Sequence, residues 1–228
     1  MTKWPAKLII VRHGESLFNR EKDERREGRR KQYSERLRSM RPFDFPLTRQ
    51  GTTQARQAGL WISQHIGIPN IVYTSPFLRT RETSQELHRA FPHVPLVEDE
   101  RVREKEFGMM ELISQDEFSS RFPQEFTRRQ HEGKYYYRPP GGESIPDVNL
   151  RVHNFLSMLI REHAGETVVV VTHYMVILSF RKLLERWSEQ EFLATDKASF
   201  ISNASATLYT ADDTTDKLTL VYFNKTIP

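Results

Sequence analysis

The fold is decided by the stretch Leu8-Ile9-Ile10-Val11-Arg12-His13-Gly14-Glu15-Ser16. Its four consecutive aliphatic residues predict a strand that is buried on both faces of a sheet. The strand stops abruptly at a cation, an imidazole and a glycine. In an open α/β sheet, residues at the carboxyl end of a strand face the crevice where ligands bind. Gly14 allows the sharp turn and the close backbone approach that such a crevice requires.

Two further apolar stretches have the same form. Residues 70–75 and 167–172 each predict a short buried strand, and helical patterns separate them from each other and from the first strand. Strands that alternate with helices predict an α/β fold with a mostly parallel sheet. The polar residues that follow these strands, Ser75 with Arg79 and His173, are therefore expected at the same sheet edge as His13.

Weaker signals complete the expected elements. Residues 96–97 predict another short strand, and residues 205–210 and 217–223 predict two strands near the C-terminus. Residues 115–134 predict one helix, because phenylalanines recur at spacings of four, although a proline interrupts the pattern.

The composition limits the class of protein. A chain of 228 residues, with 37% hydrophobic and 28% charged residues, suits one domain with a sizeable core, and we expect a single domain over residues 1–228. The absence of cysteine from the sequence excludes disulfides and thiolate metal sites. No apolar run approaches the roughly 20 residues that span a bilayer. We expect no signal peptide in Met1–Lys7 and a cytoplasmic location.

The positive charge of the chain belongs to one segment. Residues 20–41 contain ten Lys or Arg against five acids, a local charge of +5, so the formal charge of +4 leaves about −1 for the rest. We expect residues 20–46 to be a basic insertion that forms a solvated helix or a mobile loop, since no apolar stripe anchors it. A second hypothesis is that the segment is part of a lid that adds cations for a polyphosphorylated or otherwise acidic substrate.

The residues expected at the sheet edge suit phosphoryl transfer without a metal. Arg12 and Arg79 can form planar, charge-assisted hydrogen bonds with phosphate oxygens. One of the two imidazoles, His13 or His173, can attack phosphorus while the other stabilises the equatorial oxygens. A carboxylic acid is still required to protonate the leaving oxygen.

Several ordered motifs make the chain similar to the histidine phosphatase superfamily, branch 1, which includes phosphoglycerate-mutase-like proteins and histidine acid phosphatases. The resemblance implies a three-layer α/β/α fold with a mostly parallel central sheet. It covers most of the chain and rests on motifs at Arg12-His13-Gly14-Glu15-Ser16 with Asn19, Leu47-Thr48-x-x-Gly51, Ser75-Pro76-x-x-Arg79-Thr80, Glu104-x-x-x-Gly108, Gly142-Glu143-Ser144 and Val171-Thr172-His173.

The resemblance also implies a role for each matching residue. His13 is the expected nucleophile, which forms a phosphohistidine, and Glu104 is the expected proton donor. Glu106 and Glu111 lie close to Glu104 in the sequence, and the position relative to Gly108 favours Glu104. Substrate binding is expected from Arg12, Ser16, Asn19, Arg79 and His173, and Arg12, Arg79 and His173 would also neutralise the transferring group. Positive neighbours should keep His13 neutral by disfavouring its cation. We expect neither a metal nor another cofactor. Glu143 could orient the loop beside His173 or be an ordinary loop carboxylate.

The family contains mutases and phosphatases, and three functions stay open. Mutases of the family carry a longer insertion before the Gly142-Glu143-Ser144 motif, whereas only residues 109–141 intervene here, so a phosphatase of a small phosphorylated metabolite is favoured. A phosphoglycerate-mutase-type phosphotransferase is the alternative. A function of another class is polyanion binding through the basic segment, although nucleic acid is an unlikely partner because no nucleic-acid motif accompanies it. An inactive binding scaffold is disfavoured by the complete residue set, and a homodimer is possible.

Overall fold

The computed structural model describes residues 3–212 and 214–227. Met1 and Thr2, which belong to the stretch examined for a signal peptide, lie outside the described residues, as do two other positions of the expected domain, 213 and 228. Within the described ranges, no helix combines the length and the apolar character needed to cross a membrane.

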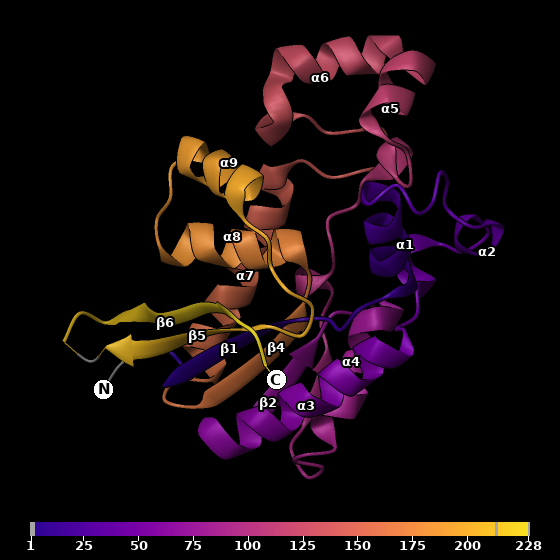
Figure 1. The fold of residues 1–228 in the computed structure, drawn as a ribbon. Helices are drawn as coiled ribbons and strands as arrows, with labels where there is room; N and C mark the ends of the chain where they lie inside the picture. Colours follow the sequence, from indigo (N-terminus) through magenta and orange to yellow (C-terminus); the bar gives the residue numbers. More distant parts are fainter. Residues whose placement is uncertain (1–2, 213, 228) are drawn as a thin grey trace.

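The described residues build a central sheet of six strands (Figure 1). The spatial order is β3-β2-β4-β1-β5-β6, and the strands are β1 (Lys7–Arg12), β2 (Ile71–Thr74), β3 (Leu96–Glu98), β4 (Thr167–Thr172), β5 (Ala206–Asp212) and β6 (Lys217–Lys225). The first four strands in this order pair in parallel, and β5 and β6 add an antiparallel edge. The mostly parallel sheet that the sequence predicts is confirmed.

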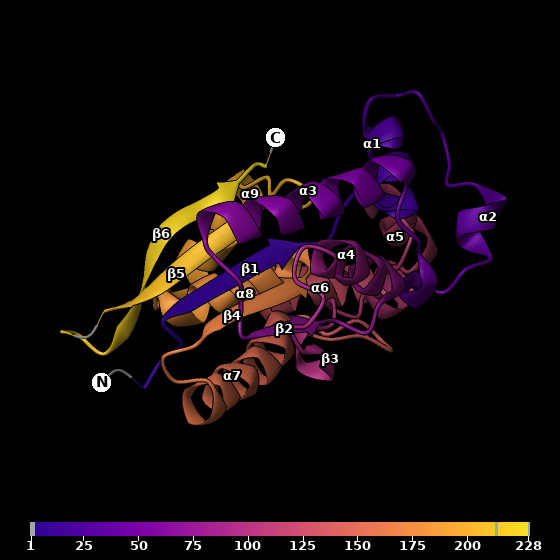
Figure 2. The same ribbon diagram turned by 90° about the horizontal axis from the view of Figure 1, so that it is seen from below.

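Helices cover both faces of the sheet, which confirms the three-layer α/β/α arrangement. α3 (Arg49–His65) and α4 (Leu78–His88) lie on one face, and α7 (Ile145–Glu162) and α8 (Tyr174–Leu184) lie on the other (Figure 2). The remaining helical elements are α1 (Leu17–Arg26), α2 (Glu35–Arg38), α5 (Gln115–Arg121), α6 (Pro123–Tyr136), α9 (Glu189–Ala198) and the 3-10 turns η1 (Pro42–Asp44), η2 (Glu100–Val102) and η3 (Gly108–Met110).

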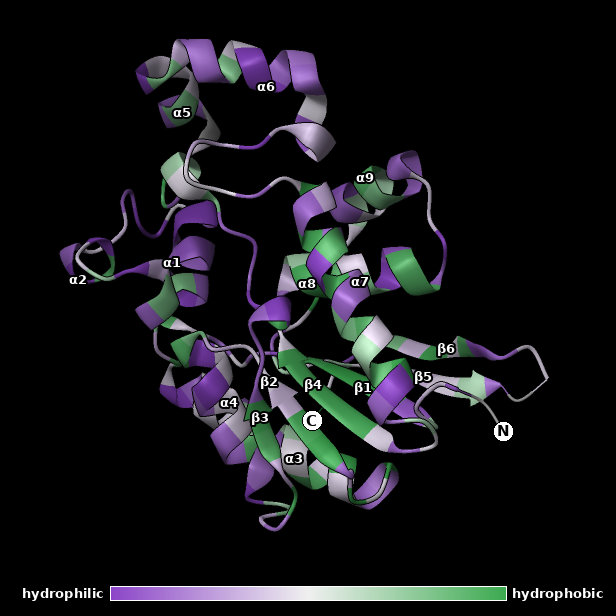
Figure 3. Cartoon of the chain, turned by 180° about the vertical axis from the view of Figure 1, so that it is seen from behind, coloured by the Kyte–Doolittle hydropathy of each residue, from purple (hydrophilic) through white to green (hydrophobic). Residues whose placement is uncertain are grey.

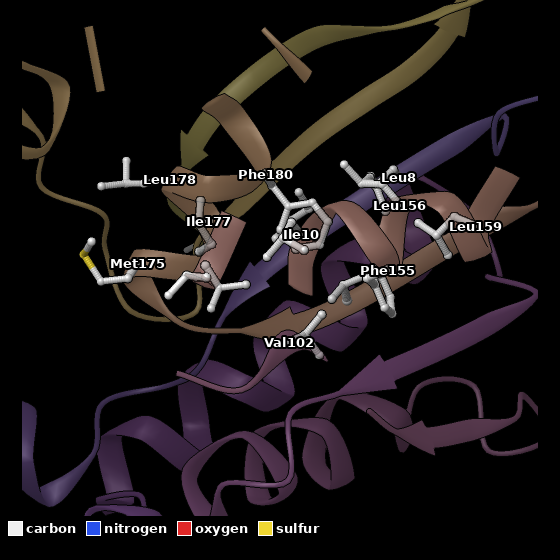
Figure 4. Close-up of a cluster of buried hydrophobic side chains, with 14 of the residues drawn as sticks. Leu8, Ile10, Val102, Phe155, Leu156, Leu159, Met175, Ile177, Leu178 and Phe180 are labelled. Atoms are coloured by element: carbon white, nitrogen blue, oxygen red, sulfur yellow. The ribbon is translucent and has the colours of Figure 1, made fainter. Parts of the chain in front are cut away.

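The alternation of side chains along β1 distributes the core over both layers. Leu8 and Ile10 pack with residues of α7 and α8, such as Phe155 and Phe180 (Figure 4), whereas Ile9 and Val11 face α3 and α4. Each of these strand side chains is completely buried. Burial of one such side chain stabilises the fold by roughly 1.5–3 kcal/mol. The apolar colouring of β1, β2 and β4 in Figure 3 follows from this two-sided burial.

The basic segment has more secondary structure and more apolar packing than the sequence predicts. It forms α1, α2 and η1, and its own small core contains Leu17, Leu37 and Phe45, which are at most 6% exposed. Phe18 and Tyr33 pack against this core. The expectation that no apolar residues anchor the segment is therefore wrong. The apolar residues come from three short elements, so they show no helical period in the sequence.

The single helix predicted over residues 115–134 is also wrong. Phe122 leaves the helical conformation, with φ −133° and ψ 60°, and Pro123 begins a new helix, α6, at its first position. α5 and α6 lie beyond the carboxyl edge of the sheet (Figure 1). α6 carries mostly hydrophilic residues (Figure 3).

Candidate active site

The polar ends of the three central strands meet at one edge of the sheet. Arg12 pairs with Thr172 at the end of the parallel β1–β4 ladder, and β2 lies on the other side of β4. The N–H of His13 donates to the carbonyl oxygen of Thr172, 3.0 Å away, and so extends the register beyond the strands. The ring centroids of His13 and His173 are consequently 5.2 Å apart.

His13 is held in one neutral tautomer. Its Nδ1 lies 2.7 Å from the carbonyl oxygen of Gly14, which can only accept, so Nδ1 carries the proton. Nε2 accepts a hydrogen bond of 3.2 Å from Nε of Arg79. Burial, reinforced by the charges of Arg79 and Arg12, holds the pKa of His13 well below its usual range. Nε2 is therefore unprotonated, and its lone pair is held by the hydrogen bond from Arg79, which an arriving anion can take over.

Two arginines supply positive charge beside this ring. Nη1 of Arg12 donates to the carbonyl oxygen of Ile201, and its buried Nε has no partner among the described residues. Arg79 donates from Nη1 to the carbonyl oxygen of Pro42, 2.8 Å away, and its guanidinium stacks on Phe77. Burial lowers the pKa of Arg79 to about 10, so it keeps its charge at neutral pH. Both arginines can bind an anion.

His173 lies immediately behind this cluster. It is completely buried, and its Nε2 is 2.7 Å from Oγ of Ser75. Because the N–H of Phe77 donates to the same Oγ, the hydroxyl can direct its own hydrogen to Nε2, which leaves the imidazole proton on Nδ1. Nδ1 is buried and has no partner within the described part of the chain. Burial, with the charge of Arg79, holds the pKa of His173 well below its usual range.

Ser16 and Asn19 form a capping box at the start of α1. Oγ of Ser16 donates to Oδ1 of Asn19, which also accepts from the N–H of Ser16 and from Nδ2 of Asn203. Oδ1 of Asn19 is thus occupied in fixing the loop, and its amide Nδ2 makes no hydrogen bond in the described part of the protein. Asn19 lines the cavity beside His13, whereas Ser16 is buried and does not. The structure places Ser16 as a helix cap.

In the described part of the chain, five carboxyl groups line the same cavity as the cations, those of Asp23, Glu104, Glu106, Glu111 and Asp196, and two of them have a raised pKa. Glu104 lines the cavity, and burial raises its pKa, against the opposing charge of Arg79. Glu111 lines the same cavity, and burial raises its pKa to about 7. A carboxyl group with a raised pKa can donate a proton near neutral pH.

The loop that carries Glu104 is held by Glu143. Oε1 of Glu143 accepts 2.9 Å hydrogen bonds from Nη2 of Arg103 and Nε of Arg151, and Oε2 accepts from the N–H of Glu106 at 3.0 Å. Although burial opposes it, the bonds from Arg151 hold the pKa of Glu143 below its usual range. Val102 of the same loop accepts a 2.7 Å hydrogen bond from Oγ1 of Thr172, the residue before His173. Of the two interpretations of Glu143, the contacts therefore favour the one in which it orients the loop beside His173.

The loop after His13 rests directly on the start of α3. Thr48 N–H donates to the carbonyl oxygen of Glu15, and the N–H of Glu15 donates to Oε1 of Gln54, each over 2.9 Å. A Cβ on Gly14 would lie 2.4 Å from the carbonyl oxygen of Gly51, and a Cβ on Gly51 would lie 2.1 Å from that of Glu15. Any side chain at either glycine would force these two backbones apart.

Arg12, His13, Asn19, Arg79, Glu104 and Glu111 line a cavity of about 580 Å³, whereas His173 does not line it. α1, with Tyr33, Pro42 and Phe45 of the basic segment, contributes to its lining, as do α6, α9 and residues 199–203. Besides Arg12 and Arg79, its lining contains five cations: Lys22, Arg26, Lys105, Arg129 and Lys134. Within residues 3–212 and 214–227, no three His, Cys, Asp or Glu side chains are grouped so as to hold a metal ion.

Lys22 lines the cavity but was not singled out from the sequence, and Glu111 was weighed there only as a neighbour of Glu104. Lys22 lies one helical turn after Asn19 in α1, a spacing that places both on one face and could have indicated it. Its pKa is lowered by its enclosure at the cavity and by the nearby Arg12. Glu111 directly follows η3 and has no comparable signal, since its approach to Arg79 depends on the folding of the whole loop.

Comparison with known proteins gives relatives of two activities. The chain is 30% identical over 191 residues to a 2,3-bisphosphoglycerate-dependent phosphoglycerate mutase 2 of Gloeobacter violaceus, a match that covers 82% of this chain and 78% of that protein. It is 32% identical to phosphoserine phosphatase 1 of Hydrogenobacter thermophilus over 74% of this chain and 71% of that protein.

The fold of the chain also matches solved structures. YhfR of Bacillus stearothermophilus superposes with a TM-score of 0.74 at 24% identity, over 96% of both chains. The family model of the histidine phosphatase superfamily (branch 1) matches residues 8–224. Since this match spans both histidines, both arginines and the strands that position them, the chain belongs to the histidine phosphatase superfamily, branch 1.

Proposed function

We propose that the protein is a phosphomonoester hydrolase that works through a phosphohistidine on Nε2 of His13 and needs no metal. The observation that carries the proposal is the state of His13. Its proton is fixed on Nδ1 by Gly14, and its pKa is held well below its usual range by burial, Arg79 and Arg12. A nucleophile in this state does not have to lose a proton before it attacks.

The first half-reaction transfers the phosphoryl group to the enzyme. Nε2 of His13 forms a bond to phosphorus while the ester P–O bond breaks. The guanidinium groups of Arg12 and Arg79, together with Nδ1–H of His173 and the amide of Asn19, stabilise the equatorial oxygens. The leaving alkoxide takes a proton from the carboxyl group of Glu104 and departs as an alcohol.

The second half-reaction returns the enzyme to its starting state. The carboxylate of Glu104 takes a proton from water, the water oxygen bonds to phosphorus, and the N–P bond breaks. Inorganic phosphate leaves, Nε2 of His13 regains its lone pair, and Glu104 is again protonated. Atoms and charge balance over the cycle with water as the only co-reactant.

The short connection between the loop of Glu104 and the Gly142-Glu143-Ser144 motif favours hydrolysis over mutase activity. It comprises only η3, α5 and α6, shorter than the insertion expected for mutases. A cavity of about 580 Å³ also suits a small phosphorylated metabolite, since ligand pockets range over roughly 300–1,000 Å³. A mutase is the second candidate, which the 30% identity to a phosphoglycerate mutase supports.

The test combines turnover with trapping of the intermediate. We would measure phosphate release from p-nitrophenyl phosphate and a panel of phosphorylated metabolites in the presence of EDTA. Quenching with alkaline denaturant during turnover of a ³²P-labelled substrate would preserve a phosphohistidine, which is stable to base and labile to acid. His13→Ala is the test variant, and His93→Ala, at an exposed histidine, is the matched control.

Release and trapping that survive EDTA, persist in His93→Ala and vanish in His13→Ala would support the hydrolase. Interconversion of phosphoglycerates without phosphate release, dependent on 2,3-bisphosphoglycerate, would favour the mutase. Metal-dependent turnover that His13→Ala retains would overturn the proposed chemistry.

A further inference from the structure

A second cavity of about 400 Å³ lies beside the catalytic one. Four cations line it: Arg25, Lys31 and Arg38 from the basic segment, and Arg121 from α5. Glu117 is the single carboxylate in its lining. The folded chain therefore collects an excess of three positive charges around one hollow.

The cations of this cavity are poorly neutralised by the protein. Lys31 has no ion pair among the described residues. Arg25 stacks on the ring of Tyr33, with its guanidinium carbon 4.3 Å from the ring centre, and Nη2 of Arg38 donates to the neutral amide of Gln32 over 2.8 Å. Of the four, Arg121 alone has a carboxylate partner within 4 Å in the described structure, at 3.1 Å from Glu117.

Other arginines of the same segment do have carboxylate partners. Arg29 pairs with Glu27, Arg30 with Glu24, and Arg41 with Asp44. Arg25, Lys31 and Arg38 thus line the cavity without a carboxylate partner among the described residues. Mutual repulsion among these cations disfavours the folded state unless an anion offsets it.

The wall between the two cavities is shared. Tyr33, Leu112 and Ile113 line both of them, and Tyr33 and Leu112 pack on the small core that contains Leu37. A ligand in the second cavity would therefore contact side chains that also face the substrate.

From these observations we infer that Arg25, Lys31, Arg38 and Arg121 form a second site that binds a phosphate-rich anion. Guanidinium and ammonium groups around a hollow of this size suit a compact group with several phosphate oxygens. The anion is either a second phosphate of the substrate itself or a separate oligophosphate. The inference does not depend on the chemistry at His13, because binding can be measured without turnover.

The decisive experiment compares two double variants of equal charge. Lys31→Gln/Arg38→Gln removes two cations of the cavity. Arg29→Gln/Arg36→Gln is the control. It removes two exposed cations of the same segment that do not line the cavity, and Arg36 lies in α2, as Arg38 does. Inorganic tripolyphosphate would be titrated into each protein by calorimetry at low ionic strength, where charge contacts are least screened.

We expect two tripolyphosphate sites in the wild type, one of them the catalytic cavity, and a loss of at least tenfold in affinity at the other in Lys31→Gln/Arg38→Gln. The control variant should stay within twofold of wild type at both sites. An equal loss of tripolyphosphate affinity in the two variants would show that only the overall charge matters and would overturn the proposed second site. No loss of affinity in either variant would also overturn it. Tighter binding of single-stranded RNA, weakened equally in both variants, would also overturn it in favour of a diffuse nucleic-acid surface.

Kinetics then separate the two sources of the anion. If the anion is a second phosphate of the substrate, then for one particular chain length the alkanediol bisphosphate should have a KM at least fivefold below that of the monophosphate of the same alkanediol. That advantage should disappear in Lys31→Gln/Arg38→Gln. If the anion is a separate molecule, added tripolyphosphate should alter turnover of p-nitrophenyl phosphate in the wild type but not in this variant. If the protein turns over none of these substrates, the proposed hydrolase is contradicted. The calorimetric titration then decides by itself whether the second site exists.

Discussion

Arg79 donates a hydrogen bond of 2.8 Å from Nη1 to the carbonyl oxygen of Pro42, so a residue of the basic segment fixes the arginine that touches His13. Pro42 begins η1, directly before the buried Phe45. The orientation of the guanidinium therefore depends on the core of a segment that lies outside the three layers.

The first prediction concerns that core. Leu37→Ala should lower the free energy of unfolding by about 2–5 kcal/mol, because Leu37 is completely buried and lines neither cavity. It should also lower kcat/KM, since a loosened η1 no longer holds Arg79. Chemical denaturation and steady-state kinetics would measure both effects. Leu37→Met, which conserves volume, should cost less than about 1.5 kcal/mol and keep kcat/KM near that of the wild type. Full activity in Leu37→Ala would contradict the link to Arg79.

The second prediction concerns the acid. Glu104→Gln should reduce kcat by about 10²–10⁴-fold for alkyl phosphates, whose leaving alkoxide needs a proton. The loss should be much smaller for p-nitrophenyl phosphate, because its phenolate leaves without protonation. Glu111→Gln serves as the comparison, since Glu111 shares the cavity and also has a raised pKa. If the loss of kcat depends more strongly on the leaving group in Glu111→Gln than in Glu104→Gln, Glu111 and not Glu104 is the proton donor.

The third prediction is the pH dependence of kcat/KM for an alkyl phosphate. Because the pKa of His13 lies well below 6.5, the imidazole stays neutral and nucleophilic in mildly acidic solution. Because the pKa of Glu104 is raised, this acid stays protonated above its ordinary range and then loses its proton as the pH rises. Activity should therefore be highest on the acidic side of neutrality and decline on the alkaline side, and Glu104→Gln should lack the alkaline decline. An acid limb near pH 6.5 that stays in place when the alkyl phosphate is exchanged for one with a different second pKa would show instead that His13 titrates normally.

The fourth prediction tests Glu143 as a positioning residue. Glu143→Gln weakens the hydrogen bonds that hold the loop of Glu104, so kcat for alkyl phosphates should fall by about tenfold with little change in KM. In a Glu104→Gln background the same substitution should have almost no further effect on kcat, because its action passes through Glu104. A double-mutant cycle measures this coupling. Independent, multiplicative losses would indicate that Glu143 acts in another way.

The sequence predicts the layers and the sheet edge because both depend on local patterns. A strand of consecutive aliphatic residues, such as Leu8 to Val11, is buried only if helices cover both faces of the sheet. The polar residues that follow such parallel strands then lie at the same edge of the sheet. His13, Arg79 and His173 lie together at the sheet edge for this reason. Glu104 was placed by resemblance, and the structure brings it to the same cavity.

What the sequence does not predict depends on contacts between short elements. Leu37 and Phe45 lie among charged residues and acquire a common core only when α1, α2 and η1 have folded together. Pro123 could belong to a kinked helix or begin a new one, and the conformation of Phe122 decides between them. Glu111 reaches Arg79 through the path of a whole loop, for which no residue spacing gives a signal.

The contact between Gly14 and Gly51 has a consequence for exchanging parts between relatives. No side chain lies between these two backbones, so no rotamer can absorb a mismatch between the loop of His13 and the first turn of α3. The backbone bonds through Glu15 fix the two pieces further. A chimera that imports residues 13–16 from another protein should fold and turn over only if it imports residues 48–54 with them, so these two stretches, distant in sequence, form one transplantable module.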